Sequence, residues 1–296
     1  MSNLLQIRTR LLFCCFLLLS VKGIYAQKEV VRFKQFTLDQ GLSMNFITCF
    51  HQDSKGFMWV GTWEGLNKYD GYKFTVYRHQ SNVEGSLHNN SIADIHEDKK
   101  GVLYVATEDG LHVYNPGKDN FTVFHHDPQN PKSLLVDKIT VVFEDHRGAL
   151  WIGTELGGLS MFNSDSGTFT NFRHDPQNPA SIANDIVRSI DEDAAGNLWV
   201  GTEDGISIFD KDRKGFTHIK HNAANPGSLS VNFIRKLFID SNDNVWVGTA
   251  FGGLNLYNKK TKTFSHFKHS NEDPNSLLGD YVPGICESND GNIWVA

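Results

Sequence analysis

The sequence is poor in cysteine, lacks an excess of positive charge and has only one long apolar run. Two of its four cysteines, Cys14 and Cys15, lie in that run, so Cys49 and Cys286 alone cannot form a framework of several disulfides. Lysine and arginine number 28 against 34 acidic residues, a net charge of −6, which argues against nucleic-acid binding through a basic surface. No segment after the apolar run is apolar enough to span a bilayer.

The N-terminus reads as an export signal. Arg8 and Arg10 precede the apolar stretch Leu11–Leu19, and Ala26 offers a small residue before Gln27. This order of basic, apolar and small residues predicts a secretory signal over residues 1–26, cleaved after Ala26. An uncleaved membrane anchor is the alternative, but the run is shorter than the ~20 residues that a spanning helix needs.

The rest of the chain lacks helical periodicity and carries one repeat. An aromatic residue flanked by apolar residues, mostly followed by Gly-Thr, recurs every 45 to 48 residues. We call these six positions the aromatic comb: Trp59, Tyr104, Trp151, Trp199, Trp246 and Trp294. Periods in this range indicate propellers or solenoids.

Each repeat has turn signals about every ten residues. A short apolar strand ends in an acidic turn, the aromatic strand follows, a Gly-Leu or Gly-Ile step opens a third strand, and two spaced apolar residues mark a fourth. Four short antiparallel strands per repeat predict an all-β fold, a β-propeller of four-stranded blades. We expect a propeller over residues 27–296, with five complete blades and a partial sixth. Their approximate ranges are 41–86, 87–132, 133–180, 181–227, 228–275 and 276–296.

Two recurring polar residues have a structural and a functional interpretation. An aspartate stands six residues before the comb aromatic in five repeats: Asp53, Asp98, Asp145, Asp193 and Asp240. A glycosidase Asp box has a different spacing and a calcium loop needs more acidic ligands, so we expect each aspartate to cap its own turn. A histidine also recurs once per repeat: His79, His126, His174, His221 and His269. One histidine per blade spreads the set around a ring, so we expect structural or solvent-facing roles and no metal site.

The first repeat resembles the two-component regulator propeller family. The residues that carry the resemblance are Gly41-Leu42-Ser43-Met44-Asn45, Gly56-Phe57-Met58-Trp59-Val60-Gly61-Thr62 and Gly65-Leu66-Asn67-Lys68-Tyr69-Asp70-Gly71-Tyr72-Lys73-Phe74. Such repeats form the periplasmic sensor of hybrid two-component systems that detect glycan fragments. In the full architecture, further blades, a second propeller and a β-sandwich precede a membrane span, a histidine kinase, a receiver and a DNA-binding domain. The resemblance covers residues 30–296.

The resemblance implies a non-catalytic, periplasmic ligand-sensing propeller that binds an oligosaccharide or another small ligand, without a cofactor. Kinase activity, an inner-membrane anchor and a homodimer would belong to further parts of a longer protein. We expect the chain to be its N-terminal part, cut from a seven-bladed ring, because it stops in the second strand of the sixth repeat. Phe33-Lys34-Gln35-Phe36 matches the fourth-strand pattern and would be a stray strand of that ring. The alternatives are a secreted propeller enzyme (a lyase, glycosidase or quinoprotein) and a protein-interaction scaffold.

A ligand site is expected on the face that carries the loops between the second and third strands. Aromatic, carboxylate and amide side chains there suit sugar binding, through stacking and paired hydrogen bonds. The expected ligand-binding residues are Trp63, Glu64, Glu108, Asp109, Glu155, Glu203, Asp204 and Phe251. Trp63 ranks first because it is the one tryptophan off the comb. No catalytic residues are expected, since the polar residues that break the repeat form no converging acid-base set.

Overall fold

A computed structural model describes residues 34–296 of the chain. The predicted export signal, residues 1–26, lies outside the described residues. The chain divides into two units, Met1–Gln35 and Phe36–Ala296, and the fold described below is that of the second. Within the described residues, no helix is long and apolar enough to cross a membrane.

The second unit is all-β and contains five four-stranded antiparallel sheets and one two-stranded sheet. A single 3₁₀ turn, η1 (Leu38–Gln40), precedes them. The first sheet comprises β1 (Ile47–Gln52), β2 (Met58–Thr62), β3 (Gly65–Tyr69) and β4 (Phe74–Tyr77). The second comprises β5 (Ile92–Glu97), β6 (Leu103–Thr107), β7 (Gly110–Asn115) and β8 (Asn120–Phe124). The third comprises β9 (Ile139–Glu144), β10 (Leu150–Thr154), β11 (Leu159–Asn163) and β12 (Thr168–Phe172).

The remaining sheets repeat this order. The fourth comprises β13 (Val187–Glu192), β14 (Leu198–Thr202), β15 (Gly205–Phe209) and β16 (Phe216–Ile219). The fifth comprises β17 (Ile234–Ile239), β18 (Val245–Thr249), β19 (Leu254–Asn258) and β20 (Thr263–Phe267). The sixth consists of β21 (Ile285–Glu287) and β22 (Ile293–Val295). In every sheet the strands pair in chain order. The predicted class, all-β with four-stranded antiparallel blades, is confirmed.

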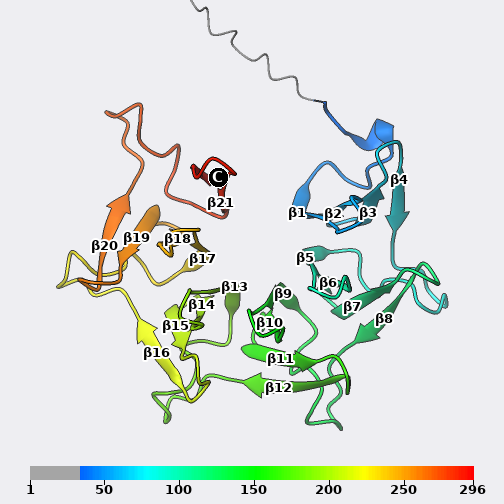
Figure 1. The fold of residues 1–296 in the computed structure, drawn as a ribbon, viewed down its shortest axis with the longest axis horizontal. Helices are drawn as coiled ribbons and strands as arrows, with labels where there is room; N and C mark the ends of the chain where they lie inside the picture. The colour runs from blue at the N-terminus through cyan, green and yellow to red at the C-terminus, as the bar shows by residue number, and fades with distance from the viewer. Residues whose placement is uncertain (1–33) are drawn as a thin grey trace, which may run out of the picture. The chain divides into compact units, whose positions relative to one another are not determined.

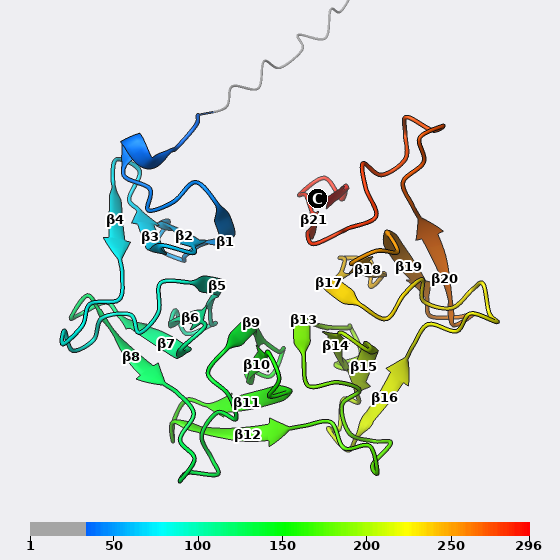
Figure 2. The same cartoon turned by 180° about the vertical axis from the view of Figure 1, so that it is seen from behind.

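The sheets are arranged around a common centre as blades of a propeller (Figure 1). The first strand of each sheet (β1, β5, β9, β13, β17 and β21) lies innermost, and β4, β8, β12, β16 and β20 lie at the periphery. The reverse view in Figure 2 shows the same order. We call β1, β5, β9, β13, β17 and β21 the inner strands. A functional group near the centre therefore comes from the inner strands or from the loops beside them.

The hydrophobic core lies between adjacent blades. Trp59 in β2 shares a buried cluster with Leu103 and Val105 of the second blade, and Trp151 in β10 shares one with Val200 of the fourth. Close packing of the blades requires a small residue two positions after the comb aromatic. A Cβ atom added to Gly153 would lie 2.5 Å from Val141 Cγ1 and 2.7 Å from Val187 Cγ1. The Trp-apolar-Gly motif is therefore a packing motif between blades.

The recurring aspartates cap their own turns, as predicted. Asp145 Oδ1 accepts hydrogen bonds from the backbone N–H groups of Arg147 (3.0 Å) and Ala149 (2.9 Å). Its Oδ2 accepts one from Trp151 Nε1 at 3.0 Å. Asp53, Asp193 and Asp240 bond in the same way. The aspartate thus joins the turn to the comb tryptophan six residues later, which explains why the two recur together.

The recurring histidines make hydrogen bonds to the crossover, the segment that joins the fourth strand of one blade to the first strand of the next. His126 Nδ1 lies 2.7 Å from the carbonyl oxygen of Leu134, and its backbone N–H donates to Asp137 Oδ1 at 2.6 Å. The other four histidines make the same pair of contacts. Within residues 34–296, no group of three or more histidine, cysteine or acidic side chains is arranged to hold a metal ion. The structural role predicted for these histidines is confirmed by their contacts.

The stray strand expected at residues 33–36 is not formed in the part of the chain that the structure describes. Residues 34–37 have no strand structure. The ring of Phe36 instead packs edge-on against Tyr69 and Phe74, with centroids 4.9 and 5.6 Å away. An aromatic residue of the fourth-strand pattern can thus pack on the first blade without being part of a strand.

Candidate functional site

A hollow of about 800 Å³ opens where the inner strands begin, beside the loops that follow the second strands. Three inner-strand residues on its wall, Thr140, Arg188 and Arg235, each stand eleven positions before a comb aromatic. Glu108 and Glu155 reach the same wall from the loops after β6 and β10. The fold therefore brings residues from separate blades to one place.

One side of the hollow is a continuous series of ion pairs. Lys138, directly before β9, places its Nζ 3.2 Å from Glu108 Oε1 and 3.3 Å from Glu155 Oε2. Arg188 Nη1 lies 3.5 Å from the same Glu155 oxygen, and Arg188 Nη2 lies 2.7 Å from Glu203 Oε1. Arg235 Nη1 also approaches Glu203 Oε1, at 3.3 Å. We call these six side chains, which alternate in charge from the second to the fifth blade, the ionic arc.

The hollow is aromatic at the first and sixth blades. Phe46 and Trp63 stack with their ring centroids 4.3 Å apart, and both side chains remain about half exposed. Tyr281, before β21, is also exposed and lines the same hollow. The hollow thus combines a charged side with an aromatic side, an arrangement that suits a ligand with a polar edge and an apolar face.

The structure brings together four of the eight predicted ligand-binding residues. Trp63, Glu108 and Glu155 line the hollow, and Glu203 joins them through its ion pairs with Arg188 and Arg235.

The other four predicted residues are not among those that line the hollow. The backbone carbonyl of Glu64 accepts a hydrogen bond from Arg78, and Asp204 pairs with Lys220. Asp109 lines a separate depression beside the crossover residues His79 and His88. Phe251 is exposed, with its ring 6.4 Å from that of Phe233. Alternate residues of these short loops face different ways, which the repeat pattern did not reveal.

Sequence reasoning missed the cations of the ionic arc and two of its aromatic neighbours, Phe46 and Tyr281. A signal for the arginines does exist in the repeat. The position eleven residues before the comb aromatic is Thr48, Ala93 and Thr140 in the first three repeats and arginine, Arg188 and Arg235, in the next two. A change from small residues to arginine at a fixed position, beside the predicted carboxylates, would have pointed to this side of the hollow.

Partly buried carboxylates connect the inner strands away from these loops. Asp94 Oδ2 in β5 accepts a hydrogen bond from the N–H of Val142 in β9, at 2.9 Å. Asp191 Oδ2 in β13 accepts one from Ile239 in β17, at 2.8 Å. Burial raises the pKa of Asp191 to about 6 and moves the pKa of Asp94 in the same direction. These groups join adjacent blades, and neither lines the hollow.

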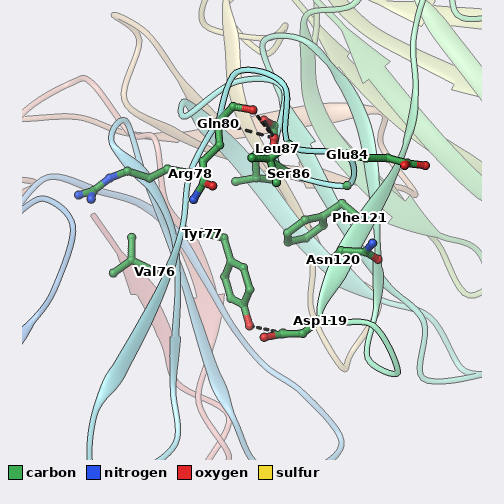
Figure 3. Close-up of a pocket in the computed structure, with 12 residues that line it drawn as sticks. Val76, Tyr77, Arg78, Gln80, Glu84, Ser86, Leu87, Asp119, Asn120 and Phe121 are labelled. Carbon is green, nitrogen blue, oxygen red and sulfur yellow. Dashed lines mark hydrogen bonds between the residues drawn. The ribbon is translucent and has the colours of Figure 1, made fainter.

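A second hollow, of about 160 Å³, lies between the outer strands β4 and β8 and the crossover that joins the first two blades (Figure 3). Its central polar groups already satisfy one another. The hydroxyls of Tyr77 and Tyr114 both donate to Asp119 Oδ1, at 2.6 and 2.5 Å. The bonds from Tyr114 and Tyr77 lower the pKa of Asp119. This hollow is a junction between blades, and the central hollow is the stronger candidate for a ligand.

Comparison with known proteins identifies the repeat. Six segments match the family described as two component regulator propeller: residues 41–64, 86–109, 133–155, 181–204, 228–251 and 276–296. The chain is 26% identical to the extracellular domain of the hybrid two component system BT3049 from B. thetaiotaomicron, with a TM-score of 0.70. That match covers 88% of this chain and 40% of the other.

Two further similarities differ in what they show. Over 72 residues the chain is 42% identical to histidine kinase P4 of Formosa agariphila. These residues make up 24% of this chain and 5% of the kinase. Virginiamycin B lyase from Staphylococcus aureus superposes with a TM-score of 0.61 over 91% of this chain and 82% of the lyase, at 13% identity, which shows a shared fold alone. The chain spans less than half the length of the two-component relatives it matches. The six matched segments show that the chain carries six repeats of the two component regulator propeller family.

Proposed function

We propose that these residues form a non-catalytic, ligand-sensing propeller, the N-terminal part of a two-component sensor that detects glycan fragments in the periplasm. The similarity to the extracellular domain of a hybrid two component system supports the sensor class. Signal cleavage after Ala26 and a propeller over residues 27–296 are part of the proposal. Kinase activity, membrane anchorage and a homodimer are proposed for the longer protein rather than for these residues.

The observation that carries the proposal is the composition of the central hollow. The stacked pair of Phe46 and Trp63 offers an exposed aromatic surface in the same hollow that the ionic arc lines. A pyranose has apolar C–H faces and an edge of hydroxyl groups, so an aromatic surface beside carboxylates and guanidinium groups is complementary to it. A volume of about 800 Å³ is within the usual range for small-molecule sites and accommodates a short oligosaccharide.

The same side chains argue for binding without turnover. A general acid or base must be able to exchange a proton with the bound ligand. In the ionic arc, both lining carboxylates contact Lys138, and Glu155 also contacts Arg188. In these ion pairs an oxygen of each lining carboxylate already contacts a cation of the protein instead of a ligand. The geometry therefore favours a receptor site over a hydrolytic or lyase site.

The test is a calorimetric screen of the purified chain against neutral and acidic oligosaccharides, with chromatographic product analysis of each mixture. We expect one class of saccharide to bind and to be recovered unchanged. Turnover of the bound saccharide would replace the sensor proposal with an enzyme. Mass spectrometry of the periplasmic fraction tests the location, since an intact segment of residues 1–26 would contradict signal cleavage.

A further inference from the structure

We infer that the central hollow selects saccharides that carry a carboxylate, as uronic acids do, and that Arg235 is the residue that binds this group. The inference rests on the proposed function, because it names the class of saccharide that the same hollow would take. It is carried by three observations: the charges on the wall of the hollow, the incomplete pairing of Arg235, and its place at the end of the ionic arc.

The ionic arc as a whole is electrically neutral, with three cations and three carboxylates. Its three cations, Lys138, Arg188 and Arg235, all line the hollow, whereas Glu203, which pairs with both arginines, is not among the lining residues. The whole chain, by contrast, has a net charge of −6. An anionic ligand therefore meets less repulsion at the hollow than an average position on the chain would give it.

Arg235 is the least satisfied member of the ionic arc. Glu203 Oε1 accepts hydrogen bonds from Arg188 Nε (3.1 Å) and Nη2 (2.7 Å) and a longer one from Arg235 Nη1 (3.3 Å). Arg188 thus holds the shared oxygen with two short contacts, and Arg235 holds it with one long contact. The Nε of Arg235 is buried and has no hydrogen-bond partner among residues 34–296. A buried donor without a partner is unfavourable, and a ligand carboxylate that turned the guanidinium toward itself would relieve this cost.

The chemistry of the guanidinium favours a carboxylate over a hydroxyl group. Its planar N–H groups match the two oxygens of a carboxylate in parallel hydrogen bonds, which a single hydroxyl cannot reproduce. Arg235 ends the ionic arc in the fifth blade, and the aromatic residues of the sixth and first blades line the same hollow. An oligosaccharide that contains a uronic acid would place the carboxylate at Arg235 and the face of one of its sugar rings on the aromatic surface of Phe46 and Trp63.

The experiment compares matched acidic and neutral ligands by isothermal titration calorimetry. The acidic set contains oligogalacturonides, oligoglucuronides and oligomannuronides, and the neutral set contains their methyl esters, which keep the sugar rings and remove the charge. We expect at least one acidic oligosaccharide to bind at least ten times more tightly than its ester. Arg235→Gln should weaken that binding roughly 10- to 100-fold, and Arg235→Lys, which keeps the charge, should weaken it less.

Arg173→Gln is the matched control, because Arg173 pairs with Asp185 and does not line the hollow. Its affinity should equal that of the wild type. Thermal unfolding of each variant establishes whether it is folded. If Arg235→Gln does not fold, Arg235→Lys still tests the inference. Equal binding of acid and ester would overturn the inference and leave the proposed function standing. If the acidic oligosaccharides, their methyl esters and other neutral saccharides all fail to bind, both the inference and the proposed function are overturned. Tight binding of sulfated saccharides alone would reject the carboxylate as the recognised group.

Discussion

The two ends of the inner strands differ in how closely they follow the repeat. At the end of β9, Asp145 forms the same turn and the same bond to a comb aromatic as its equivalents in other blades. At the beginning of the inner strands, the hollow is lined by residues that change from blade to blade, such as Thr140, Arg188 and Arg235. Regular positions hold the blades together, and irregular positions near the centre form the candidate site.

The comparison shows which tryptophans belong to the framework. Trp151 is 1% exposed and lies between the third and fourth blades, while Trp63 is 53% exposed at the hollow. Burial of apolar surface is the main source of stability, so the first should matter for folding. An exposed aromatic surface next to charged groups contributes little to folding and is available to a ligand.

The largest expected effect is on stability, in Trp151→Ala. Removing a fully buried indole leaves a cavity between two blades and a carboxylate, Asp145, without its Trp151 Nε1 donor. We expect the free energy of unfolding to fall by about 3–5 kcal/mol, as measured by urea denaturation. Trp63→Ala is the control and should lower it by less than about 1 kcal/mol. Similar losses in the two variants would contradict the division into framework and site.

The next effect is on binding, in Trp63→Ala. Loss of a stacking aromatic costs on the order of 1–3 kcal/mol, by analogy with base stacking, so saccharide affinity should fall roughly five- to 150-fold. Phe251→Ala is the matched control, since Phe251 is also exposed but does not line the hollow. Unchanged affinity in Trp63→Ala, with binding otherwise intact, would place the saccharide site elsewhere.

Much of the fold could be predicted from the sequence, because its determinants recur. The comb aromatics, the turn aspartates and the crossover histidines repeat at fixed spacing, and each makes the same contact in several blades. The site was predictable only in part. Trp63 stood out because it breaks the repeat, and Glu108, Glu155 and Glu203 were found through their shared loop position.

The cations of the site could not be found from loop composition, since they lie in or beside the inner strands. Which loop residue faces the hollow depends on the conformation of each short loop, so Glu108 lines it while its neighbour Asp109 lines a separate depression. A fourth-strand pattern at Phe36 was likewise ambiguous, because the same aromatic side chains can cover a blade without forming a strand.

The smallest expected effect concerns a partly buried carboxylate that joins inner strands. Burial raises the pKa of Asp191 to about 6, above its ordinary value of 3.8. The folded state therefore binds the proton more tightly than the unfolded state, so stability rises as the pH falls from above 6 toward 4. Between pH 7.5 and 5.5, wild type should gain about 1 kcal/mol relative to Asp191→Asn, measured by urea denaturation at each pH.

The matched control for this pH effect is Asp212→Asn, which removes the same charge from an exposed pair with Lys214. It should keep the pH dependence of the wild type, because Asp212 lies between β15 and β16 and its side chain pairs with Lys214 and not with an inner strand. If Asp191→Asn kept the full pH dependence as well, the gain would come from other groups and not from this connection between β13 and β17. If it lost the dependence without losing saccharide affinity, the inner strands would serve two separate roles. Their partly buried carboxylates would couple the blades, and the residues where the strands begin would recognise the ligand.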